Sequence, residues 1–150
     1  MHYVIGDVHG CYDELMNLLN RIDADDSDAK FCFLGDFPDR GPKIRETLDW
    51  MLANITEDGK YQSIRGNHEQ NIIDWATDEH RDSCEDYAIF CKEIFNGDGR
   101  KIQEITDFFD KLPYNKLLNI TLKNGNVVPY RICHAAHKPG VTEKEYPRIH

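Results

Sequence analysis

The sequence lacks long hydrophobic runs and an excess of basic residues, and each absence excludes a class of protein. No apolar run approaches the roughly 20 residues that a membrane helix needs, and residues 1–5 are too short and polar for a signal peptide. Lysine and arginine number 18 against 27 aspartate and glutamate residues, for a net charge of −9. We therefore expect no membrane partner and no nucleic-acid-binding surface, and bound divalent cations would offset part of the negative charge.

Cysteine is scarce and has no disulfide-framework spacing. The five cysteines are an odd number, and no Cys-x-x-Cys pair occurs. Cys84 and Cys91 could share a helix face, but packing is the default interpretation over a redox or zinc role. We expect reduced thiols and a cytoplasmic protein. The 150 residues suffice for one domain with a real core, and no internal repeat or linker divides them.

Strand and helix patterns alternate along the chain and indicate an α/β protein. Apolar runs typical of strands occur at residues 1–5, 31–34, 61–64, 117–122 and 127–133. Helical spacing occurs at 12–22, 42–53 and in a block at about 69–112. In the first helix the residues at core spacing are Leu15, Leu18, Leu19 and Ile22. Asn124-Gly125 separates the last two strands and is the strongest short signal for a hairpin.

Four segments share one pattern, an apolar strand followed by polar residues that suit a metal ion. They are Gly6-Asp7-Val8-His9-Gly10, Gly35-Asp36-Phe37-Pro38-Asp39-Arg40-Gly41-Pro42, Gly66-Asn67-His68-Glu69 and Cys133-His134-Ala135. Ligands of open α/β sheets bind at the carboxyl ends of strands. The four strand ends therefore predict one shared site.

The residue types in these segments indicate the chemistry. Asp7 and His9 can converge from one turn on a single cation, although a surface turn with an incidental histidine is the alternative. Asp36 suits a metal ion. Asn67 offers a neutral oxygen ligand. The neighbouring His68 is either a group that titrates near physiological pH or a helix-capping or buried, hydrogen-bonded histidine.

Together the four segments resemble the motifs of the metal-dependent calcineurin-like phosphoesterases. The likeness is greatest to the serine/threonine protein phosphatase branch with its small bacteriophage and bacterial enzymes, and the motifs follow in the same order with compatible spacings. The resemblance implies a metallophosphoesterase-type β-sandwich flanked by helices (α/β/β/α). Residues 1–150 would form a single domain, with a cap-like helical insertion at about 69–112.

The resemblance also implies a centre with two divalent metal ions, Mn²⁺ foremost and Fe or Zn²⁺ as alternatives. On this basis Asp7 and His9 hold the first metal and Asp36 bridges both metals. Asn67 and His134 belong to the second metal. The pair would activate water and hold the phosphoryl oxygens.

Four further residues receive catalytic roles from the same resemblance. His68 would protonate the leaving oxygen, and Asp39 would orient its ring. Arg40 and Arg65 would bind the phosphate oxygens through their forked donors.

The expected activity is hydrolysis of phosphomonoesters by a serine/threonine or broad-specificity phosphatase. Its substrate would be a phosphorylated protein or a small phosphoester. Asp39 and Glu69 are of the protein-phosphatase kind. The alternative is a diadenosine tetraphosphate or other dinucleoside polyphosphate hydrolase. Those enzymes share the first segment and Arg40-Gly41-Pro42, but they usually lack the acid at position 39 and have aspartate after the histidine.

Two departures from the family pattern affect these expectations. Pro38 replaces an apolar residue and removes a backbone donor, so Asp39 could point differently. The family also continues to a Gly-His segment that completes the second metal site, and none follows Gly140 here. We therefore expect the N-terminal two-thirds of a domain. Three alternatives remain open: weak binding of the second metal, a replacement ligand from His137, His150 or another chain, or a non-catalytic metal-binding module. An unfinished sheet would also favour pairing between chains.

Overall fold

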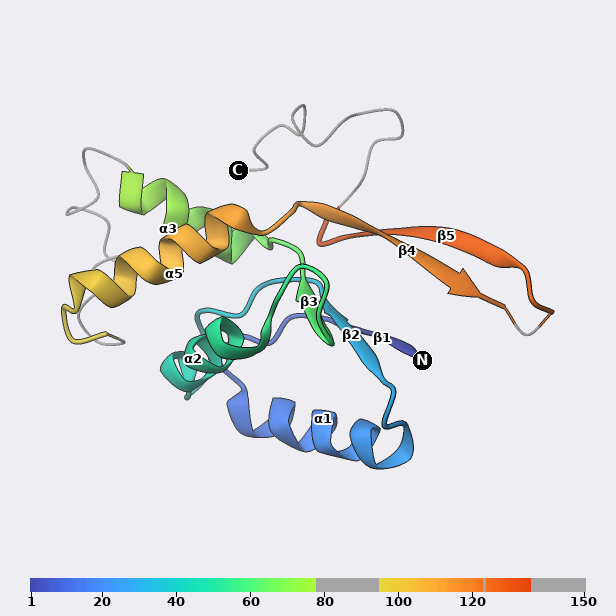
Figure 1. Cartoon of the computed structure of the whole chain (residues 1–150). Coiled ribbons are helices and arrows are strands. Elements are labelled where there is room, and N and C mark those ends of the chain that lie inside the picture. Colours follow the sequence, from blue (N-terminus) through green and yellow to red (C-terminus); the bar gives the residue numbers. More distant parts are fainter. Residues whose placement is uncertain (78–94, 123, 136–150) are drawn as a thin grey trace.

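The structure is a computed structural model that describes residues 1–77, 95–122 and 124–135 (Figure 1). Its strands are β1 (His2–Ile5), β2 (Lys30–Phe33), β3 (Tyr61–Ser63), β4 (Asn115–Thr121) and β5 (Val127–Cys133). Its helices are α1 (Tyr12–Asp25), α2 (Ile44–Asn54), α3 (Asn67–Thr77) and α5 (Gly99–Lys111). The predictions for Cys84, Cys91, His137 and His150, and for the middle of the helical block, lie outside the described residues.

The first sheet consists of three parallel strands in the order β1-β2-β3, which confirms the first three predicted strands. The central strand β2 is buried along Phe31, Cys32 and Phe33, as expected for a continuous apolar run in a parallel sheet. The Phe33 ring lies 5.7 Å from that of Trp50 in α2, and Phe31 stacks on Tyr3 at 5.6 Å. This aromatic layer joins the sheet to α2.

The helices follow the predicted patterns with two differences. α1 buries Leu15 and Leu19, but Leu18, predicted for the core, is 43% exposed because it lies on the outer flank of the buried stripe. α2 begins at Ile44, so Pro42 belongs to the preceding turn and not to the helix. α3 and α5 contact each other and form a second helical layer (Figure 1). In the part of the chain that the structure describes, no helix is long and apolar enough to cross a membrane.

The second sheet is the predicted hairpin, in which β4 and β5 pair antiparallel with Asn115 opposite Cys133. Gly125 has φ 82°, a left-handed conformation that glycine adopts without strain at the hairpin turn. Leu117 and Tyr130 are each 52% exposed, so the hairpin is lightly buried. Its far end extends beyond the three-stranded sheet (Figure 1).

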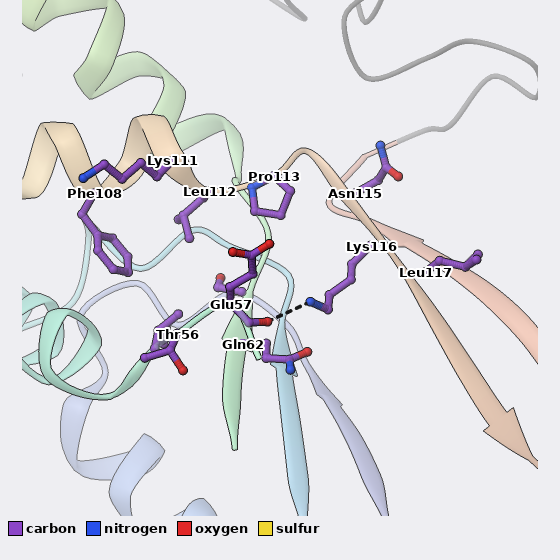
Figure 2. Close-up of a pocket in the computed structure, with 12 residues that line it drawn as sticks. Thr56, Glu57, Gln62, Phe108, Lys111, Leu112, Pro113, Asn115, Lys116 and Leu117 are labelled. Carbon is purple, nitrogen blue, oxygen red and sulfur yellow. Dashed lines mark hydrogen bonds between the residues drawn. The ribbon is translucent and has the colours of Figure 1, made fainter. Parts of the chain in front are cut away.

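A pocket of about 580 Å³ lies between the end of α5, β3 and the start of β4 (Figure 2). Phe108, Leu112 and Pro113 supply its apolar side. On the opposite side the Lys116 ammonium donates a hydrogen bond to the main-chain oxygen of Glu57 at 3.1 Å. None of the predicted site residues lines this pocket.

Candidate metal centre

The turns that follow β1 and β2 are joined through their backbones. The N–H groups of Val8 and His9 both donate to the carbonyl of Asp36, at 3.0 and 2.8 Å. Gly41 packs against the first turn so closely that a Cβ would lie 2.0 Å from the carbonyl oxygen of His9. Only glycine permits this approach, which explains why glycine stands at position 41.

The turns that follow β2 and β3 meet at a pair of glycines. Gly35 has φ 97°, and a Cβ there would lie 2.3 Å from the backbone nitrogen of Gly66. A Cβ on Gly66 would lie 2.1 Å from Oδ1 of Asp36. The two glycines therefore let the second and third turns approach until their polar side chains share one space.

Backbone strain is concentrated in these turns. Among the described residues, the non-glycine positions with positive φ are His9 (44°), Asp36 (54°), Asp39 (69°), Arg40 (70°) and Asn96 (52°). Each such residue costs on the order of 1–3 kcal/mol and persists only where the surroundings hold it. Four of the five are predicted site residues, and such strain is common at functional sites.

Two groups of potential ligands converge on Asp36. One comprises His9, Asp36 and His68, and the other comprises Asp7, Asp36 and His134, with the ligand atoms of each group within 4.8 Å of one another. Asp36 is 3% exposed and belongs to both groups. Asp7 is 52% exposed and lies between the groups, with carboxylate oxygens 3.8 Å from Nε2 of His9 and 4.0 Å from Nδ1 of His134.

The unpaired nitrogen of His9 fits a metal ion. Nδ1 of His9 lies 2.9 Å from the carbonyl oxygen of Pro38, so Nδ1 carries the proton and donates. Nε2 is then a bare acceptor, and it is buried without a hydrogen-bond partner in the described part of the chain. A buried acceptor beside the Asp36 carboxylate is stabilised by a cation.

His134 arrives from the end of β5 and is fixed at both ring nitrogens. Nδ1 lies 2.8 Å from the carbonyl oxygen of Leu34, and Nε2 lies 2.9 Å from Oδ1 of Asn67 and 3.3 Å from Oδ2 of Asp36. Donation from Nδ1 leaves Nε2 facing two oxygen acceptors, an arrangement that requires a proton or a metal ion between them. The residues present therefore fit the divalent ions that the resemblance implies.

Electrostatics at Asp36 and His134 agree with this geometry. The hydrogen bond that the His134 ring donates to Asp36, together with the charge of that carboxylate, raises the pKa of His134 to about 9. Burial raises the pKa of Asp36, but the hydrogen bonds from His134 and from the His68 N–H outweigh it, so the net pKa lies below the ordinary value. Both shifts favour positive charge beside an ionised Asp36.

His68 has the contacts expected of an oriented proton carrier. Its Nδ1 lies 2.6 Å from Oδ2 of Asp39, and its Nε2 lies 3.2 Å from Nη2 of Arg40. Pro38 therefore does not turn Asp39 away from the ring. The catalytic roles of these residues stay predictions, but the structure brings the three side chains together.

Arg65 lies apart from this cluster. Its side chain is 6% exposed and donates through Nη1 to Gln70 at 2.9 Å and to the hydroxyl of Tyr114 at 3.1 Å, while Nη2 donates to the main-chain oxygen of Asp110. The guanidinium carbon stacks 4.6 Å from the centre of the Tyr114 ring. In this arrangement Arg65 links β3 to α3 and to the start of β4, and its expected contact with phosphate stays a prediction.

Sequence reasoning used Glu69 only to choose a branch of the family and missed its place in the structure. The side chain is 0% exposed and accepts three backbone N–H groups, from Asp36, Phe37 and Gly66. Burial raises the pKa of Glu69, and the hydrogen bonds from Phe37 and Asp36 oppose that rise. The available signal was an acid in the first turn of a helix, three residues after a glycine.

Comparisons with known proteins identify the family of this chain. The family model of the calcineurin-like phosphoesterases matches residues 3–146. Symmetrical bis(5'-nucleosyl)-tetraphosphatases from Neisseria meningitidis and Haemophilus influenzae are each 38% identical, over 72 and 78 residues. These matches cover 48% and 51% of this chain but 25% and 26% of the relatives, so the matched part is about a quarter of their length.

A solved structure is similar in fold. It is a protein serine/threonine phosphatase from Saccharomyces cerevisiae, with a TM-score of 0.52 and 23% identity, and the match covers 76% of this chain and 33% of that one. This likeness supports the metallophosphoesterase fold, and the family model spans nearly the whole sequence. The chain belongs to the calcineurin-like phosphoesterase family.

Proposed function

We propose that this chain hydrolyses phosphoesters with the help of divalent metal ions, and that its substrates are dinucleoside polyphosphates. The observation that carries the proposal is the convergence of two ligand groups on the buried carboxylate of Asp36. The names of the curated relatives favour a dinucleoside tetraphosphate over a phosphoprotein. The order of the two sequence-based interpretations is therefore reversed here.

The metal-binding residues that we propose are those predicted from the sequence, although in the structure Asp7 groups with His134 and His9 groups with His68. Asp7 and His9 would hold one ion, Asn67 and His134 a second, and Asp36 both, with Mn²⁺ as the first choice of metal. Such ions supply Lewis acidity toward the phosphoryl oxygens and make water a nucleophile at neutral pH. The protein itself excludes water from Asp36 and orients the histidines through their second ring nitrogens.

His68 is the residue that would protonate the leaving oxygen. Its Nδ1 proton is held by Asp39, which fixes the orientation of the ring. Nε2 accepts a hydrogen bond from Arg40 in this structure, and it would carry a proton to the leaving oxygen once Arg40 turns to the phosphate. The Arg40 guanidinium beside it would bind a phosphoryl oxygen and stabilise the charge that develops during cleavage.

A serine/threonine phosphatase is the second candidate. The contact between Asp39 and His68 supports it, because an acid at that position is the feature that the sequence shares with the protein-phosphatase branch. For both candidates we propose one domain in which the helical block around α3 and α5 acts as a cap. The free thiols of Cys11, Cys32 and Cys133 agree with a cytoplasmic location.

The test is a comparison of two substrates. The chain is incubated with Mn²⁺ and either diadenosine tetraphosphate or a phosphoserine peptide, with Asp36→Asn as the inactive control. We expect cleavage of the dinucleotide to ADP at the higher rate, seen by ion-exchange chromatography. Faster release of phosphate from the peptide would favour the second candidate. Bound Mn²⁺ without turnover of either substrate would leave the non-catalytic metal-binding module as the correct interpretation.

A further inference from the structure

Glu69 is a fully buried carboxylate that touches three separate backbone positions. Oε2 accepts the N–H groups of Asp36 at 2.9 Å and of Gly66 at 2.8 Å, and Oε1 accepts that of Phe37 at 2.7 Å. Asp36 and Phe37 belong to the turn after β2, whereas Gly66 belongs to the turn after β3 and Glu69 itself to the first turn of α3. One side chain therefore ties two of the turns together.

The local backbone requires an anion at this place. Gly35 and Asp36 both have positive φ, at 97° and 54°, and the N–H groups of Asp36 and Phe37 converge on the Glu69 carboxylate. Successive N–H groups in such a conformation form an anion-binding hollow. Without the carboxylate these buried donors would lose their partners, and the strained Asp36 backbone would lose the group that holds it.

The contacts of Glu69 also affect the orientation of Asp36, the candidate metal ligand. The backbone of Asp36 is bound to Glu69, and its Oδ1 accepts the N–H of His68 at 3.0 Å. With Oδ1 so held, Oδ2 faces His134 at 3.3 Å and His9 at 3.8 Å. The direction in which Asp36 presents its free oxygen thus depends on the link between the two turns.

Space around the carboxylate is limited. A Cβ on Gly66 would lie 2.8 Å from Oε2 of Glu69 and 2.1 Å from Oδ1 of Asp36. Glutamine at position 69 would keep the length but would point an NH₂ group at a backbone N–H. Aspartate would keep the charge but is one methylene too short to bond both sides.

We infer that Glu69 is a positioning residue that fixes Asp36 for metal binding by bonding the backbones of Asp36, Phe37 and Gly66. Glu69 does not touch the metal or the substrate. This inference rests on the proposed metal centre. It goes beyond that proposal because it assigns the geometry of the shared ligand to a carboxylate outside the ligand set.

The test is a Mn²⁺ titration by calorimetry on the full chain, with Glu69→Gln, Glu69→Asp and a matched control. The control is Ile105→Val, a cavity mutation at a fully buried position of α5 that lowers the melting temperature without touching the turns. We expect Glu69→Gln to lower Mn²⁺ affinity by about 10- to 100-fold. Glu69→Asp should lower it less. Ile105→Val should leave it unchanged.

The outcomes separate the two proposals. If the wild-type chain binds no Mn²⁺, the proposed metal centre fails before Glu69 is tested. If the wild type binds Mn²⁺ and folded Glu69→Gln binds it equally well, the positioning role is wrong. If both Glu69 variants fail to fold even at low temperature, Glu69 serves the fold as a whole, and the specific role in placing Asp36 is overturned.

Discussion

The turns at the strand ends and the β4–β5 hairpin both contribute to the candidate metal centre, but they are held by different means. The turns are joined by backbone hydrogen bonds, and the carboxylates of Asp36 and Glu69 are buried between them. The hairpin leaves Leu117 and Tyr130 half exposed and supplies His134 alone among the candidate ligands. A packed region therefore supplies most of the centre, and a lightly buried one completes it.

The difference teaches that His134 owes its orientation to the turns more than to its own strand. Its ring is hydrogen-bonded to the carbonyl of Leu34, which follows β2, and to Asn67, the first residue of α3. A hairpin of low burial can therefore present a ligand accurately, because the receiving region is already fixed.

A large loss of Mn²⁺ affinity is expected at Asp36, which potential ligands from both regions face. Asp36→Asn removes the charge that both ligand groups face, so Mn²⁺ affinity should fall by at least about 100-fold, the upper end for outer-shell partners of a metal. Calorimetric titration measures the affinity for Mn²⁺. Asp49→Asn is the matched control, since Asp49 is an exposed residue of α2 that pairs with Lys101. An Asp36→Asn variant with wild-type affinity would show that the two groups do not form one centre.

The next effect separates catalysis from binding within the turn region. His68→Asn should lower kcat by about 10²- to 10⁴-fold, because it removes the proposed acid, while Mn²⁺ affinity stays within a few-fold of the wild type. The measurement pairs initial rates with a Mn²⁺ titration. His2→Asn, at an exposed position of β1, is the control. An unchanged rate in His68→Asn would rule out its role as the acid.

A matched pair of leucines compares the stability of the two regions directly. Leu48→Ala, at a fully buried position of α2, should lower the free energy of unfolding by about 2–5 kcal/mol. Leu117→Ala, in the hairpin, should change it by less than about 0.5 kcal/mol, since this side chain is half exposed. Urea unfolding measures both changes. Equal losses would mean that the hairpin is as strongly packed as α2, which packs against the parallel sheet.

A separate difference between the two regions concerns the reactivity of their thiols. Burial raises the pKa of Cys32 to about 11, so only a trace of its thiolate exists at pH 8, whereas Cys133 is partly exposed on the hairpin. Iodoacetamide at pH 8 should therefore label Cys32 at least about 100-fold more slowly than Cys133. Peptide mass spectrometry measures the two labelling rates. As the pH rises toward 11, the labelling of Cys32 should accelerate. Similar rates at pH 8 would contradict the tight packing of β2.

The sequence was sufficient for the parts of the site that lie on consecutive strand ends. An apolar strand followed by Asp-x-His or Asn-His predicts both the element and the polar turn, and in the structure His9, Asp36 and His68 form one group of potential ligands. Leu18 was placed in the core by spacing alone, and spacing does not resolve the edge of a buried stripe. The contact of Arg65 with Tyr114, 49 residues away, was not predictable from the local sequence either.

The burial of Glu69 was also not predictable from the local sequence. A glutamate in a first helical turn is ordinarily an exposed group that interacts with the helix dipole. Its complete burial follows from the close approach of Gly35 and Gly66, which is a property of the folded turns and not of the local sequence.

The most direct test of the metal centre is the hydrolysis of p-nitrophenyl phosphate by the full chain with Mn²⁺, with and without a chelator. Turnover that requires Mn²⁺, stops on chelation and is absent from Asp36→Asn is the predicted result, because every candidate ligand group includes Asp36. Turnover that survives chelation, or that persists in Asp36→Asn, would contradict the account.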